Sequence, residues 1–339
     1  MTGILVDQNP FGNDQHDVDR RLGAYAAPMA RAERLDLDVG GLGPDGVEWI
    51  AADLIVPDGV SVAPLMVCFP GGGMTRRYFD LPEEQPGEWS MARYLADHFG
   101  IAVAVVDHPG VGDSSVPDDP YTLNPRVVAD VDHGALSELV AHAMDLFEPT
   151  RLIGLGHSMG GLVVAHAQWH HRSFDAVAFL GFGGAGLPEY LTKAELSYAD
   201  NYERLEPVLA ELVRERFGTA LVPGSITSSD MLNPGTLSEA RQILSTASGP
   251  LLALCGLASM VPGSSNAALA SIEVPVFIGL GENDIAADIG NVAALLTSSG
   301  DVTAYVLAEA GHNHSISKNR TDLWDALGNW VAALTEQDN

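Results

Sequence analysis

The sequence GLGHSMGG at residues 154–161 places a single serine, Ser158, among small residues. The apolar run RLIGL precedes this stretch, and a segment of helical period follows it. Gly156 and Gly160 remove side chains that would collide in a tight turn from a strand to a helix. The pattern therefore predicts a serine exposed at the carboxyl end of a parallel strand, where ligand crevices form in open sheets.

Short β-branched runs alternate with longer helical segments on both sides of this turn. The expected strands are residues 65–69, 101–106, 151–155, 176–180, 274–280 and 302–307. The expected helices are residues 89–98, 125–147, 159–171, 285–298 and 321–334. This alternation predicts an α/β fold with a mainly parallel central sheet and helices on both faces. Upstream, residues 32–39 and 47–56 flank the turn-rich GGLGPDG and predict a β-hairpin.

One interval interrupts the alternation. Between Gly181 and Ile272 no comparable strand is expected, but helix-like stretches occur at residues 194–217 and 237–245. We interpret the interval as a helical cap inserted into the sheet domain. The predicted organisation is an N-terminal arm at residues 1–30, an α/β core at residues 31–181 and 273–339, and the cap at residues 182–272.

Two further groups complete the chemistry of an activated serine. A serine hydroxyl needs a general base, and the base needs an orienting acid. Asp284 follows the apolar run VPVFIGL in the loop GEND, and His312 follows VTAYVLAEA. Both groups therefore reach the same sheet edge as Ser158, in the chain order serine, acid, histidine. This arrangement predicts Ser158 as nucleophile, His312 as general base and Asp284 as the acid that orients it.

Neighbouring residues leave alternatives open. Glu282 and Asp288 could take the place of Asp284, and His314 could take the place of His312 or hold the loop by a hydrogen bond. The two histidines form an HxH pair, but no HExxH motif or Cys/His cluster accompanies them. We therefore expect neither a metal nor a cofactor.

A glycine-rich stretch, PGGGM at residues 70–74, follows the strand that ends at residue 69. Backbone N–H groups in such a loop can face a ligand without obstruction, so Gly72 or Gly73 is predicted to donate to an oxyanion together with the N–H of Met159. Residues that flank these loops or begin the cap are the candidate substrate contacts: Met74, Arg76, His157 and Tyr190.

A second glycine pattern suggests a different class of protein. Residues 181–186, GFGGAG, follow an expected strand and match the outline of a dinucleotide fingerprint. Leu187 and Pro188 come next, although a fingerprint requires a helix to open at once. We favour a flexible start of the cap over dinucleotide binding.

Composition restricts the partners. The chain has 45 acidic and 17 basic side chains and a formal charge of −28, which repels nucleic acid and anionic membranes. Its first residues do not resemble a signal peptide, and no run approaches the roughly 18 apolar residues of a membrane span. We therefore expect a cytoplasmic monomer or homodimer that acts on a neutral, partly apolar small molecule.

Taken together, the motifs resemble those of the α/β-hydrolase superfamily. The resemblance rests on GHSMGG, PGGGM, the DHPGVGDS stretch that begins at Asp107, GEND and AGH, and it spans residues 32–335. Pro70-Gly71 stands where relatives commonly have His-Gly. The resemblance implies an acyl-enzyme on Ser158, proton transfer by His312 and resolution by water. Epoxide hydrolases and haloalkane dehalogenases use an aspartate at the elbow, so Ser158 argues against both.

The sequence thus predicts a serine hydrolase that cleaves a carboxylic ester or a lactone. Several alternatives keep the same triad: carbon-carbon bond hydrolases, thioesterases or acyltransferases, and aminopeptidases. A non-catalytic protein that uses the fold to bind a small molecule is a further alternative.

Overall fold

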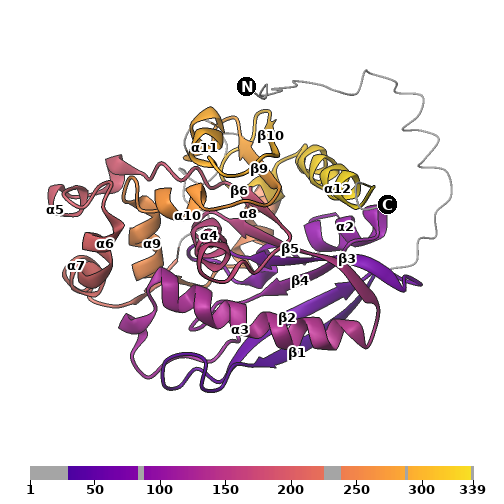
Figure 1. Ribbon diagram of the computed structural model, residues 1–339, viewed down its shortest axis with the longest axis horizontal. Coiled ribbons are helices and arrows are strands. Elements are labelled where there is room, and N and C mark those ends of the chain that lie inside the picture. The colour runs from indigo at the N-terminus through magenta and orange to yellow at the C-terminus, as the bar shows by residue number, and fades with distance from the viewer. Residues whose placement is uncertain (1–29, 83–87, 225–237, 287–288, 337–339) are drawn as a thin grey trace.

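The computed structural model describes residues 30–82, 88–224, 238–286 and 289–336. The expected N-terminal arm therefore lies almost wholly outside the described residues. An eight-stranded sheet in the order β1-β2-β4-β3-β5-β6-β9-β10 forms the centre of the molecule (Figure 1). Its strands are β1 (Arg31–Asp38), β2 (Trp49–Val56), β3 (Val62–Phe69), β4 (Ala102–Val106), β5 (Glu148–His157), β6 (Ala176–Leu180), β9 (Val276–Gly281) and β10 (Val302–Leu307).

The sheet is mainly parallel, as predicted. β3 pairs in parallel with β4 and β5, and the parallel pairing continues through β6 and β9 to β10. Only β2 runs the other way: it is antiparallel to β1, with which it forms the expected hairpin, and to β4. The carboxyl ends of the parallel strands therefore share one edge of the sheet.

Helices cover both faces, as predicted. One face carries α3 (Pro125–Met144), α4 (Met159–His171) and α11 (Ile289–Leu295), and the other carries α2 (Met91–Phe99) and α12 (Arg320–Glu336) (Figure 1). Successive residues of a strand point to opposite faces. In β3, Leu65 and Val67 belong to the core under α3 and α4, whereas Met66 and Cys68 belong to the core under α2 and α12.

The segment between β6 and β9, residues 181–275, we call the insertion. It holds short helices and one small ribbon: η3 (Pro188–Tyr190), α5 (Lys193–Leu196), α6 (Tyr202–Leu205), η4 (Glu206–Val208), α7 (Leu209–Phe217), β7 (Leu221–Pro223), α8 (Ser238–Ser245), β8 (Pro250–Leu252), α9 (Ala253–Met260) and α10 (Asn266–Ala270). Figure 1 shows α5, α6, α7 and α9 grouped at one end of the molecule.

Two details of the insertion differ from the sequence-based expectation. The stretch at residues 194–217 is not one helix, because Asp200 has a left-handed φ of 58° and Pro207 lies in the 3-10 turn η4. In addition, β7 and β8 pair as an antiparallel ribbon where no strand was expected. Strands of three residues are too short to show an alternating pattern.

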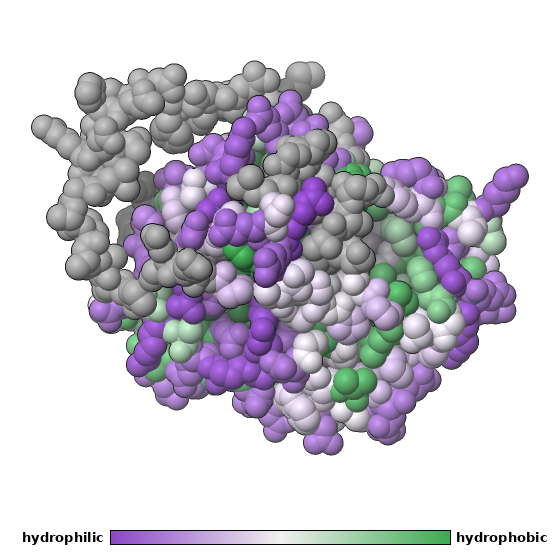
Figure 2. All heavy atoms as spheres, turned by 180° about the vertical axis from the view of Figure 1, so that it is seen from behind, coloured by the Kyte–Doolittle hydropathy of each residue, from purple (hydrophilic) through white to green (hydrophobic). Residues whose placement is uncertain are grey.

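The described surface is largely polar. Figure 2 shows hydrophilic residues over most of one face, with hydrophobic residues in separate groups. The exposed large apolar side chains, among them Leu42, Val116 and Met144, come from different elements. Within the described ranges, no helix is both long and apolar enough to cross a bilayer.

One buried histidine gives the fold a pH dependence. His166 of α4 is fully buried, and neither ring nitrogen has a hydrogen-bond partner among the described residues. Burial, with smaller contributions from His170 and Arg126, lowers its pKa from 6.5 to about 3. The unfolded chain therefore takes up a proton below pH 6.5 that the native protein does not bind, and stability falls as pH falls.

We therefore expect the variant His166→Leu to lose much less stability than the wild type between pH 7 and pH 4. The difference at pH 4 should be on the order of 3 kcal/mol in the free energy of unfolding, because each pKa unit corresponds to about 1.4 kcal/mol. Urea unfolding at both pH values measures it. At pH 7 the histidine is neutral in both states, so the two proteins should differ there by packing alone. If the free energy of unfolding fell equally in both proteins between pH 7 and pH 4, the prediction would be contradicted.

Candidate active site

Ser158 lies at a sharp turn between β5 and α4. Its φ of 53° and ψ of −123° fall in a region that residues other than glycine rarely adopt, and such outliers cluster at functional sites. The flanking glycines make the turn possible, because a side chain on Gly160 would collide with the carbonyl oxygen of Phe69 and one on Gly156 with that of Gly160. The serine hydroxyl makes no capping bond to α4, so it is not simply an N-cap.

The structure brings the three predicted catalytic side chains together. Ser158 Oγ lies 2.9 Å from His312 Nε2, to which its hydroxyl can donate. His312 Nδ1 lies 2.7 Å from Asp284 Oδ1, so its N–H donates to the carboxylate. The serine is partly exposed, whereas the His312 and Asp284 side chains are 3% and 2% exposed. This is the geometry of a nucleophile, a base and an orienting acid.

The structure places the alternative residues for the acid and the base at different positions. Glu282 is exposed, and its Oε2 accepts a hydrogen bond from the backbone N–H of Glu309. His314 does not contact the serine; its Nε2 lies 2.9 Å from Asp284 Oδ2. Asp288 lies outside the described residues.

His314 and His312 therefore share one carboxylate. His314 Nε2 lies within hydrogen-bond distance of Asp284 Oδ2 and also accepts from the backbone N–H of Gly281 at 3.1 Å, while Nδ1 has no partner among the described residues. Burial alone would raise the pKa of Asp284, but the two histidines hold it well below its usual range. The carboxylate thus stays ionised.

His157, the residue before the serine, contacts the backbone of the predicted base, His312. It is fully buried, and its Nε2 lies 3.0 Å from the carbonyl oxygen of His312 and 3.2 Å from Tyr78 Oη. Burial, together with the nearby His312 and His314, lowers the pKa of His157 well below its ordinary value. A neutral ring that donates from Nε2 therefore fixes the backbone of His312.

The glycine-rich loop passes directly beside the serine. A Cβ on Gly71 would lie 3.0 Å from Ser158 Cβ, and one on Gly72 would lie 3.7 Å from Met159 Sδ. Gly73, with a left-handed φ of 78°, instead contacts the insertion: a Cβ on Gly224 would collide with its Cα. Of the two predicted oxyanion donors in this loop, Gly72 thus lies nearer to the turn at Ser158.

A buried ion pair holds the start of this loop, and sequence reasoning missed it. His108 Nδ1 lies 2.6 Å from Asp132 Oδ2, and His108 Nε2 lies 3.1 Å from the carbonyl oxygen of Pro70. Burial alone would lower the pKa of His108, but Asp132 and the Pro70 carbonyl raise it, while burial raises the pKa of Asp132 despite the nearby histidine. Asp132 lies inside α3, and no sequence signal indicated that it faces a histidine after β4.

The structure gives the four predicted substrate contacts different surroundings. Arg76 is 5% exposed, and Asp53, Asp107 and Asp113 surround its guanidinium, so it has no free face for a substrate carboxylate. Met74 and His157 are buried in the protein. Tyr190 is 40% exposed in η3 and is not among the described residues that line the cavity at Ser158.

That cavity has a volume of about 40 Å³, and the second glycine pattern lines it. Gly181, Phe182, Gly183, Gly184 and Leu187 contribute to its wall, with Ser158, Met159, His312, Ser259, Ile285 and Ala286. The GFGGAG stretch leads only into the three-residue turn η3, not into a helix that could bind a pyrophosphate. The stretch therefore belongs to the site of Ser158. Its position directly after a parallel strand was the signal that could have identified this.

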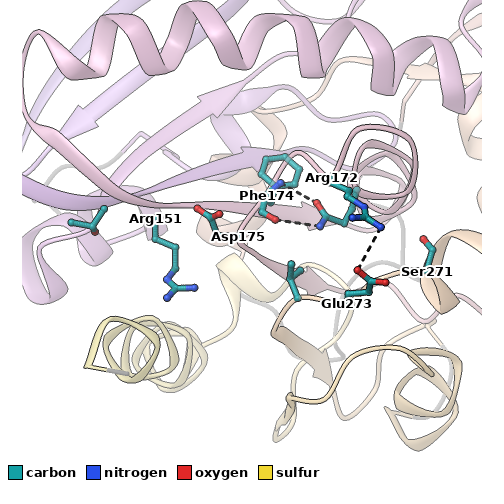
Figure 3. Close-up of a pocket in the computed structure, with 9 residues that line it drawn as sticks. Arg151, Arg172, Phe174, Asp175, Ser271 and Glu273 are labelled. Atoms are coloured by element: carbon teal, nitrogen blue, oxygen red, sulfur yellow. Dashed lines mark hydrogen bonds and ion pairs between the residues drawn. The ribbon is translucent and has the colours of Figure 1, made fainter. Parts of the chain in front are cut away.

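A larger hollow lies at the other end of the sheet. Its volume is about 560 Å³, and residues near the amino ends of β5, β6 and β9 line it, including Arg151, Asp175 and Glu273 (Figure 3). Some of its polar groups are paired: Arg172 contacts Glu273 at 3.6 Å, and Asp175 accepts from the N–H of Leu152. The smaller cavity, not this one, is lined by Ser158 and His312.

Comparison with known proteins agrees with this architecture. A family model described as "Alpha/beta hydrolase family" matches residues 66–325. No curated protein matches the sequence.

Solved structures match over most of the chain. An esterase from Exiguobacterium antarcticum has a TM-score of 0.57 at 14% identity, covering 86% of this chain and 99% of its own. A thermophilic esterase from Thermogutta terrifontis has a TM-score of 0.54 at 17% identity, covering 90% and 99%. A bromoperoxidase from Bacillus anthracis also has a TM-score of 0.54 at 17% identity, covering 91% and 100%. At these identities the likeness concerns the fold.

Proposed function

The chain belongs to the alpha/beta hydrolase family, and on that premise we propose that it is a serine hydrolase that cleaves a carboxylic ester or a lactone through an acyl-enzyme on Ser158. The observation that carries the proposal is the continuous chain of hydrogen bonds from Ser158 through His312 to Asp284, at 2.9 Å and 2.7 Å. A serine without such a base is too weak a nucleophile for this chemistry.

The reaction follows from this geometry. Ser158 Oγ attacks the carbonyl carbon while His312 Nε2 takes the hydroxyl proton, and the carbonyl oxygen becomes an oxyanion. The N–H groups of Met159 and Gly72 are the proposed donors to that oxygen. His312 then gives the proton to the departing alkoxide as the carbon–oxygen bond breaks, leaving the acyl group on Ser158. Water resolves the acyl-enzyme by the same proton route in reverse.

The cavity beside Ser158 favours a compact substrate. Its volume is only about 40 Å³. Its wall combines backbone of a glycine stretch with apolar side chains such as Phe182 and Ile285. We propose that the insertion, which supplies Leu187 and Ser259 to this wall, acts as a cap that limits substrate size.

A fluorophosphonate probe followed by a panel of 4-nitrophenyl esters tests the proposal. We expect the intact mass of the wild type to rise by one adduct and that of Ser158→Ala to remain unchanged. Among the acetate, butyrate and octanoate esters, we expect the acetate to have the highest kcat/KM, because the longer chains exceed the cavity.

Two results would count against the proposal. A folded wild type that neither reacts with the probe nor cleaves any ester or lactone would favour a binding protein. Labelling at Ser158 with equal kcat/KM for acetate and octanoate would keep the serine hydrolase but remove the size limit.

A further inference from the structure

The glycine-rich loop at residues 70–75, which we call the oxyanion loop, pairs with the insertion through backbone hydrogen bonds. The backbone N–H of Thr75 donates to the carbonyl oxygen of Ala247 at 2.8 Å, and that of Gly249 donates to the carbonyl oxygen of Gly73 at 2.8 Å. Between these bonds, Met74 and Ser248 are antiparallel bridge partners. Residues 73–75 and 247–249 thus form a short antiparallel ladder.

This ladder extends the ribbon of the insertion. Residues 247–249 lead directly into β8, which pairs with β7, and the N–H of Gly224 after β7 donates to the carbonyl oxygen of Gly249 at 3.2 Å. Gly249 thus bonds Gly73 through its N–H and Gly224 through its carbonyl, so the oxyanion loop and β7 pair with the same strand, residues 247–252. The pairing is partly buried: Met74 is 2% exposed and Ala247 is fully covered, whereas Ser248 is exposed.

One side chain of the ribbon packs directly on the proposed donor. A Cβ on Gly72 would collide with Leu251 Cδ1, so this methyl group occupies the space above the Gly72 backbone. On its other side, Leu251 contacts α9: a Cβ on Gly256 would lie 2.8 Å from the same methyl carbon. Leu251 is thus wedged between α9 and the oxyanion loop.

From these contacts, we infer that Leu251 is a positioning residue that sets the N–H of Gly72 for the oxyanion; this rests on the proposed function. Three successive glycines, at positions 71–73, have little intrinsic rigidity, so the loop needs external support. An oxyanion donor must lie about 2.7–3.1 Å from the developing charge, and losing one donor lowers kcat by about 10²–10³. The core fixes the loop at Pro70, and the insertion fixes it from Gly72 to Thr75.

The variant Leu251→Ala tests the inference against a matched control, Leu212→Ala. Leu212 is a partly buried leucine of α7, in the same insertion but outside the ribbon. For 4-nitrophenyl acetate, we expect Leu251→Ala to lower kcat roughly 10- to 100-fold with KM nearly unchanged, because donor geometry affects the transition state more than the ground state. Leu212→Ala should keep kcat, and Leu251→Met should restore it, since methionine conserves the volume.

Hydrogen exchange supplies a readout that does not depend on activity. In a Ser158→Ala background, we expect the amide of Thr75 to exchange at least about tenfold faster with Leu251→Ala than with Leu212→Ala. Equal exchange rates, or an equal loss of kcat in the two leucine variants, would overturn the inference. A wild type that cleaves no ester would instead remove the proposed function, and the exchange rates would still decide whether Leu251 holds the loop.

Discussion

Replacing Ser158 with alanine, His312 with alanine, or both together should lower kcat for ester hydrolysis by the same factor, on the order of 10⁴–10⁶. The two side chains act as one unit, because the proton that leaves Ser158 Oγ must reach His312 Nε2, 2.9 Å away. Once either side chain is absent, removing the other should lower kcat no further. Steady-state kinetics of the two single variants and the double variant measure this.

The variant Asp284→Asn tests the orienting acid, the third of the predicted catalytic side chains. It should keep the fold of the site but weaken the orientation of His312, with a loss on the order of 10⁴ in kcat. Thermal unfolding of each variant shows whether it is folded. Losses that multiply in the Ser158→Ala/His312→Ala double variant would show that the two residues act independently, contrary to the proposed mechanism.

A second large effect is expected on stability, at the buried pair of Asp132 and His108. Replacing Asp132 with alanine should lower the free energy of unfolding by about 3–5 kcal/mol, because it leaves a buried imidazole without its counterion. Both side chains are 1% exposed, so water cannot replace the lost carboxylate. Urea unfolding at pH 7 measures the change.

An exposed ion pair serves as the control. Arg172 and Glu273 lie 3.6 Å apart with side chains 80% and 65% exposed. Glu273→Ala should therefore lower the free energy of unfolding by less than about 1 kcal/mol. If both substitutions had similar effects, the pair at His108 would not support the fold in the way that its burial indicates.

Much of the fold could be predicted from the sequence, because its elements leave strong local patterns. The helix expected at residues 159–171 and the strands expected at residues 176–180 and 302–307 have the observed bounds. The insertion was less predictable. The φ of Asp200 and the pairing of β7 with β8 depend on contacts between segments distant in sequence, which leave no local period.

The candidate site, like the fold, could be predicted from the sequence only in part. Ser158, Asp284 and His312 each follow a parallel strand, so chain order alone brought them to one edge, and the structure places them within hydrogen-bond distance. The ion pairs of Arg76 could not be predicted, because its three carboxylate partners come from other loops and from β2. The contact of Leu251 with Gly72 likewise joins residues that are far apart in the chain, and no motif marks it.

The shared ribbon also bears on how this enzyme can be redesigned. A common engineering strategy treats the segment between β6 and β9 as an exchangeable module and grafts in a relative's version to change specificity. Here such a chimera would discard the strand that pairs with residues 73–75, along with Leu251. A graft that retains residues 247–252 and their pairing with β7 would alter the substrate wall while keeping the support of the oxyanion loop. The boundary between scaffold and exchangeable module therefore lies inside the insertion, not at its ends.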